Sequence, residues 1–221
     1  MPGCPGWRVR ELLAHIGFVH RWATAYVRTA LTEMVEDPDE ATILEGAPPD
    51  GELPGWVADG HAELVRALRH APADLECWTF LAAPSPLAMW ARRQAHETAV
   101  HAADAALAAG HDLPQFDPDV AADGIDELLF AFYGRDRPDP ERCDGVIGLQ
   151  ATDRPLAWTV RVSGDAVAAE GGLGASDVQV RASASELYLL LWRRRALDGL
   201  DVAGTPDAFA RLWPRRGVTW Q

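Results

Sequence analysis

The chain has 221 residues, of which 48% are hydrophobic and 24% are charged, and 20 basic against 33 acidic residues give a formal net charge of −13. This composition is typical of a globular protein, and its acidic balance argues against nucleic acid or an anionic membrane surface as a partner. No apolar run reaches the roughly 20 residues of a membrane span. Three widely spaced cysteines favour neither a zinc ribbon nor a redox dithiol, so we expect a cytoplasmic protein.

The first 110 residues show the 3.6-residue hydrophobic spacing of helices. One helix is expected over about 7–26 and a second over about 56–70, joined by a loop over 37–55 that is rich in Pro, Gly and acidic residues. A third begins near Pro84 and ends at Gly110, a typical C′ glycine. A four-helix bundle needs one more long helix. The three long helices of this half therefore leave an apolar face open. An upstream segment, a homodimer or the helix near 120–133 is expected to cover it.

The hydrophobic period changes near residue 115, and the segment 110–118 is the expected linker. Beyond it the pattern predicts a helix over 120–133, four short strands, a long helix over 185–197 and a short one over 205–212. The four strands are expected over 145–151, 156–162, 166–170 and 177–182. The predicted fold is thus a helical bundle over residues 1–112, followed by a small α+β domain over 119–221 with a mainly antiparallel sheet.

Three residues of the helical half suggest a metal site. Glu97 and His101 are four residues apart, so they lie on one face of their helix, about 5–6 Å apart at Cβ. His15 lies on or beside the apolar stripe of the first helix. If these two helices are neighbours, the three side chains supply three ligands and leave a fourth position open, the pattern of catalytic zinc. The alternative from spacing alone is a core histidine beside an ordinary Glu–His pair on a helix surface.

Three further residues near this pair have possible roles. Asp104, three residues after His101, is placed to orient that imidazole from behind the ligands, and a solvated helix acid is the alternative. Arg92 and Arg93 lie one turn before Glu97, where one of them is placed to hold a substrate carboxylate. We expect at least one of the two to be a surface charge.

Two segments of the chain carry a family resemblance. The opening PGCPGWRVRELLAH of residues 2–15, continued by VHRWA at 19–23, resembles the N-terminal signature of the mycothiol-dependent maleylpyruvate isomerase family, as does WARRQAHETAVHAAD at 90–104. The resemblance covers nearly the whole chain. It implies a DinB-like metal-binding helical bundle followed by a sterol-carrier-like domain, with the family's metal ligands falling on His15, Glu97 and His101. Relatives usually have a further helix before the opening motif, so the resemblance also implies that the first helix of the bundle is missing from this sequence.

The resemblance also implies the chemistry. In the family a divalent metal, zinc being the expected one, binds mycothiol or a related low-molecular-weight thiol and presents a thiolate to a small-molecule substrate. An isomerase adds the thiolate to a cis double bond and then eliminates it, whereas a transferase keeps it on the product. The two motifs fit an isomerase and a transferase equally well. A metal-dependent hydrolase and a non-catalytic ligand-binding or regulatory module on the same fold are the alternatives, since a fold does not fix a function.

Overall fold

The computed structural model describes residues 3–36, 38–133, 144–164 and 166–213. The chain divides into two compact units, Met1–Pro114 and Gln115–Gln221. Among the helices of the described residues, none combines the length and the apolarity that crossing a membrane requires.

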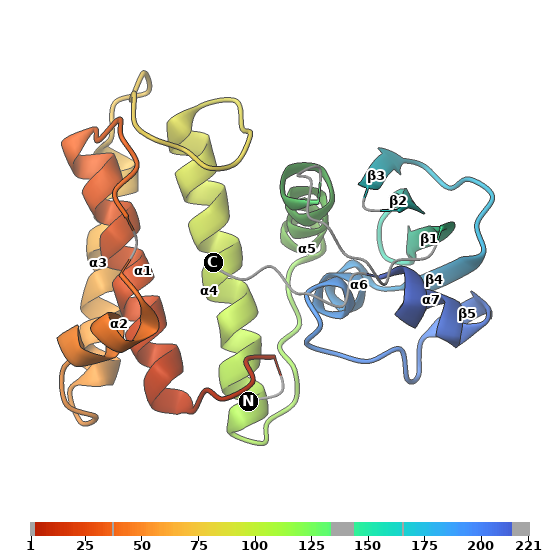
Figure 1. Ribbon diagram of the computed structural model, residues 1–221, viewed down its shortest axis with the longest axis horizontal. Coiled ribbons are helices and arrows are strands. Elements are labelled where there is room, and N and C mark those ends of the chain that lie inside the picture. Colours follow the sequence, from red (N-terminus) through yellow and green to blue (C-terminus); the bar gives the residue numbers. More distant parts are fainter. Residues whose placement is uncertain (1–2, 37, 134–143, 165, 214–221) are drawn as a thin grey trace. The chain divides into compact units, whose positions relative to one another are not determined.

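The described part of the N-terminal unit contains four helices, and the three long ones lie where the hydrophobic spacing predicts them (Figure 1). Helix α1 packs against both α3 and α4. Helix α4 ends with Ala109 as its C-cap, and Gly110 has the positive φ of 71° expected of a C′ glycine. The four helices are α1 (Val9–Thr29), α2 (Glu40–Gly46), α3 (Leu53–His70) and α4 (Pro86–Ala108).

Helix α2 corrects the prediction of a continuous loop between the first two long helices. Its start is fixed by Asp39, whose carboxylate accepts a hydrogen bond of 2.8 Å from the backbone N–H of Thr42. None of its side chains is buried. A helix without a buried face leaves no hydrophobic period in the sequence, which is why the spacing did not reveal it.

The contact between α1 and α3 depends on a glycine. A Cβ atom added at Gly17 would lie 2.0 Å from the Trp56 ring, so the backbone of α1 approaches α3 at a distance that no larger residue allows. The guanidinium of Arg21 lies 4.0 Å from the centroid of the Trp56 ring and donates to the carbonyl oxygens of Gly17 and Trp56. This packing fixes the rotation of α1 and hence the side of the helix that His15 faces.

The C-terminal unit contains a five-stranded sheet in the order β3-β2-β1-β4-β5, formed by described residues. Strand β1 is parallel to β4, and the other neighbouring pairs are antiparallel, which confirms the predicted, mainly antiparallel α+β fold. Helix α6 (Ala184–Leu191) packs against α5 (Pro118–Asp126) and against the sheet. The strands are β1 (Gly145–Ala151), β2 (Ala157–Ser163), β3 (Ala166–Gly171), β4 (Val178–Ala182) and β5 (Asp201–Gly204), and the last helix is α7 (Pro206–Leu212).

Three details of this unit differ from the prediction. The helix predicted over 120–133 begins at Pro118 and continues beyond α5 as a π-helix, η1 (Glu127–Phe132). The helix predicted over 185–197 ends at Leu191, because Arg193 has a left-handed φ of 63°. Strand β5 was not predicted: it has four residues and no buried side chain, so the alternation that marks a half-buried strand is missing.

Candidate metal centre

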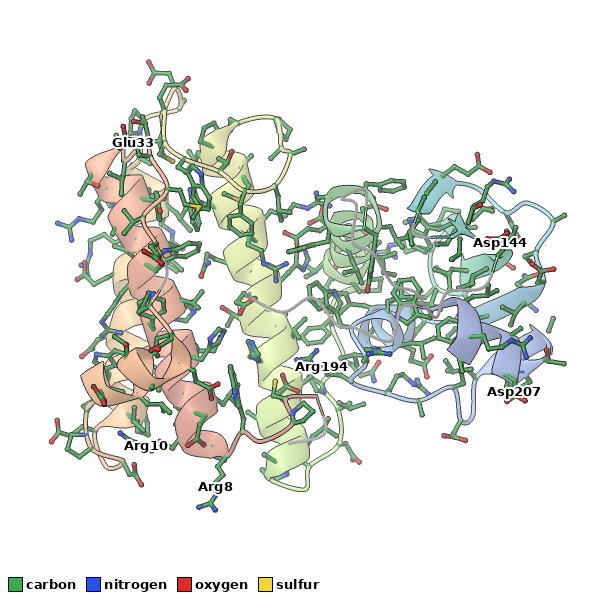
Figure 2. The ribbon with its side chains drawn as sticks, viewed as in Figure 1. Arg8, Arg10, Glu33, Asp144, Arg194 and Asp207 are labelled. Atoms are coloured by element: carbon green, nitrogen blue, oxygen red, sulfur yellow. The ribbon has the colours of Figure 1, made fainter. Side chains whose placement is uncertain are left out.

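Helices α1 and α4 supply the three predicted metal ligands of the N-terminal unit. Helix α1 begins after Arg8, whose backbone N–H donates a 2.8 Å hydrogen bond to the Glu11 carboxylate; Arg8 and Arg10 are labelled at this end of α1 in Figure 2. His15 follows almost two turns later, on the side of α1 that faces α4.

The structure brings His15, Glu97 and His101 together. The Oε1 atom of Glu97 lies 2.9 Å from Nε2 of His15 and 3.2 Å from Nε2 of His101. All three potential ligand atoms lie within 4.8 Å of one another. The exposed fractions of the three side chains are 12%, 7% and 11% in chain order, so the cluster is shielded yet reachable from solvent.

Asp104 lies directly behind His101. Its Oδ2 atom is 2.9 Å from Nδ1 of the imidazole, and its side chain is fully buried. The Sγ–H of Cys4 donates to the same carboxylate oxygen over 3.5 Å. Asp104 is therefore not a solvated helix acid: it accepts hydrogen bonds from two groups at the edge of the cluster.

Two residues at this site were not expected from the sequence. Cys4, His101 and Asp104 form a second group of potential ligand atoms within 4.8 Å. The ring of Trp7 lies 4.9 Å from the ring of His15 and 6.1 Å from that of His101, measured between centroids. Both belong to the opening motif, but nothing in their local spacing signals proximity to helix α4, because the contact spans about a hundred residues.

The two arginines before Glu97 occupy different environments. Arg93 is 1% exposed, and its Nη2 atom lies 3.3 Å from Oε2 of Glu97. Arg92 is only partly buried. Neither is a fully exposed surface charge, and the guanidinium of Arg93 is directed at a protein carboxylate.

The side chains of the cluster form an ion-pair network. Burial raises the pKa of Glu97, but hydrogen bonds from His101 and His15 and the charge of Arg93 outweigh this and hold the pKa well below its usual value. Burial lowers the pKa of His101, but hydrogen bonds with Asp104, Cys4 and Glu97 outweigh this and raise the pKa well above its usual value. Both shifts favour an ion pair between a protonated His101 and the Glu97 carboxylate, so a cation that binds there competes with a proton.

The donor set fits a divalent transition metal. Two imidazole nitrogens and one carboxylate oxygen are ligands that zinc takes, and three protein ligands leave a coordination position open. Metal-binding histidines almost always donate their other ring N–H to a carboxylate, a backbone carbonyl or water, and His101 has such a contact with Asp104. These residues together can hold a cation and expose it to a further ligand.

The fold and this cluster define a class of protein: a helical domain with a two-histidine, one-carboxylate candidate metal centre, followed by an α+β domain. The family model for the mycothiol maleylpyruvate isomerase N-terminal domain matches residues 1–106, and the model for the C-terminal domain of the same family matches residues 119–211. The chain belongs to the mycothiol-dependent maleylpyruvate isomerase family.

Two solved structures have a similar fold. The crystal structure of a mycothiol-dependent maleylpyruvate isomerase is 15% identical, with a TM-score of 0.58, and the match covers 91% of this chain and 80% of that one. A histidine-to-alanine mutant of such an isomerase is 14% identical, with a TM-score of 0.60 and the same coverage. No curated protein sequence matches the chain significantly.

Proposed function

We propose that this protein is a metal- and thiol-dependent enzyme of the isomerase or S-transferase type, which acts on a small molecule with mycothiol or a related thiol as its cofactor. The observation that carries the proposal is the convergence of His15 Nε2, Glu97 Oε1 and His101 Nε2 within 4.8 Å. Membership of the family supports the same conclusion.

His15, Glu97 and His101 are the proposed ligands of a divalent cation, with zinc the expected metal. A cation held there lowers the pKa of a thiol that binds at its open position and so supplies a thiolate nucleophile at neutral pH. The isomerase and transferase alternatives require the same three ligands, so the ligand set supports both.

The surrounding side chains have separate proposed tasks. Asp104 accepts the Nδ1–H of His101 and thereby directs Nε2 toward Glu97, which also makes the imidazole a stronger ligand. The ring of Trp7 covers the two imidazoles and shields the centre from water. Arg92, five residues before Glu97 and only partly buried, is the proposed partner of a substrate carboxylate.

The experiment is a metal analysis of the purified chain followed by calorimetric titration with mycothiol. We expect one divalent metal ion per chain. We also expect mycothiol to bind the metal-loaded protein and not the metal-free protein. His101→Ala should lose both, whereas His111→Ala, at an exposed histidine outside the cluster, should keep both. A metal-loaded protein that binds no thiol would contradict the proposal and favour a metal-dependent hydrolase, or a binding module if no turnover of any substrate is found.

A further inference from the structure

The two carboxylate oxygens of Glu97 have different neighbours. Oε1 faces the Nε2 atoms of His15 and His101, at 2.9 and 3.2 Å. Oε2 lies 3.3 Å from the guanidinium of Arg93. One oxygen is therefore directed at the two histidines, while the other contacts a permanent positive charge.

Arg93 is placed so that this contact persists. It precedes Glu97 by four residues on α4, so the two side chains lie on one face of the helix. Its side chain is 1% exposed, and a buried guanidinium cannot lose its proton and requires an anionic partner. The rigid planar donor group restricts the rotation of the carboxylate more than a flexible ammonium would.

We propose that Arg93 is a positioning residue that holds Oε2 of Glu97, so that the centre takes a cation through Oε1 alone. This inference rests on the metal centre of the proposed function. A carboxylate that binds through one oxygen leaves more of the coordination sphere for a thiol and a substrate. In this proposal Arg93 binds Glu97 and not a substrate carboxylate, so that Arg92 is the proposed partner of the substrate.

The test uses Co²⁺ as a spectroscopic probe in the full chain and in the Arg93→Met, Arg93→Lys and Arg69→Met variants. Arg93→Met should lower the Co²⁺ affinity by about tenfold or more, the usual effect of removing a group that orients a ligand, and should shift the visible absorption bands because the carboxylate binds differently. Arg93→Lys should recover part of the affinity. Arg69→Met, at an exposed arginine of α3, should match the wild type. An Arg93→Met protein with unchanged affinity and spectrum would overturn the proposal.

A metal-free measurement separates this inference from the metal centre itself. A double-mutant cycle of Arg93→Met and Glu97→Gln is followed by urea unfolding of the metal-free proteins. The two losses of stability should not add, because each single change already removes the contact between the two side chains. Additive losses would overturn the role of Arg93. A wild-type chain that takes up neither zinc nor Co²⁺ would overturn the proposed function, and the cycle would still decide whether Arg93 holds Glu97. If Arg93→Met does not fold, Arg93→Lys carries the spectroscopic test, with an intermediate loss expected and no change overturning the proposal.

Discussion

Asp104 Oδ2 lies 2.9 Å from Nδ1 of His101, and this contact decides which nitrogen of the imidazole faces Glu97. Because the carboxylate occupies Nδ1, Nε2 is the atom directed at Oε1 of Glu97. The buried carboxylate thus links the far side of the imidazole to the candidate metal centre, and it does so from the same helix that carries Glu97 and His101.

Asp104→Asn should weaken metal binding by about 10- to 100-fold, because a neutral amide accepts less strongly from Nδ1–H and leaves His101 a weaker ligand. The affinity is measured by competition with a chromophoric chelator. Asp112→Asn, at an exposed aspartate just beyond α4, is the control and should bind metal as the wild type does. An unchanged affinity in Asp104→Asn would show that His101 needs no support from this carboxylate.

Metal binding should release protons near neutral pH. The pKa of His101 is raised well above its usual value, which favours the protonated imidazole, and a cation can bind at Nε2 only after that nitrogen has lost its proton. The metal affinity should therefore rise with pH through the neutral range, with about one proton released for each metal bound at pH 7. Calorimetry in buffers of different ionisation enthalpy gives this number directly. Binding at pH 7 without proton release would contradict the prediction that His101 carries a proton before the metal binds.

His20 should make the fold sensitive to acid. The side chain is buried, its Nε2 atom lies 3.1 Å from Thr98 Oγ1, and burial together with the charge of His61 lowers its pKa to about 4. Between pH 6.5 and about 4 the unfolded chain protonates this histidine while the folded chain does not, so the contribution of His20 to stability is present above pH 6.5 and is lost as the pH falls.

The variant His20→Asn tests this contribution. Between pH 7 and pH 5 the wild type should lose about 2 kcal/mol more of its free energy of unfolding than the variant does, as measured in urea. The difference between the two proteins isolates His20 from the other titrating groups. Equal losses in both would mean that His20 titrates normally in the folded protein.

Gly17→Ala should destabilise the N-terminal unit by about 1–3 kcal/mol, the cost of inserting a methyl group into packed space. The new Cβ would lie 2.0 Å from the Trp56 ring, which must move and take its contact with Arg21 with it. Gly55→Ala, within α3 and with no atom within 4 Å of its added Cβ, should instead be neutral or slightly stabilising. Thermal unfolding of both variants measures the contrast, and a Gly17→Ala protein as stable as the wild type would show that α1 and α3 can separate at no cost.

The sequence by itself determined the local parts of this protein. The 3.6-residue spacing located α1, α3 and α4, and the change to short β-branched runs located β1 to β4, because these periods follow from backbone geometry within each element. The same geometry placed Glu97 and His101 on one face of α4. Elements with little burial, such as α2 and β5, left no such signal. The end of α6 at Leu191 could not be predicted either, because no Gly or Pro marks it in the sequence.

Only the tertiary structure decided which distant groups meet. His15 lies 82 residues from Glu97 in the chain, and Cys4 lies 100 residues from Asp104. Their contacts depend on the rotation and register of α1 against α4, which side-chain packing sets, including the close approach at Gly17. Arg93 is an example within one helix. Its spacing from Glu97 could be read from the sequence, but its burial could not. Because a buried charge is stabilised by an opposite charge, the buried guanidinium contacts the carboxylate of Glu97.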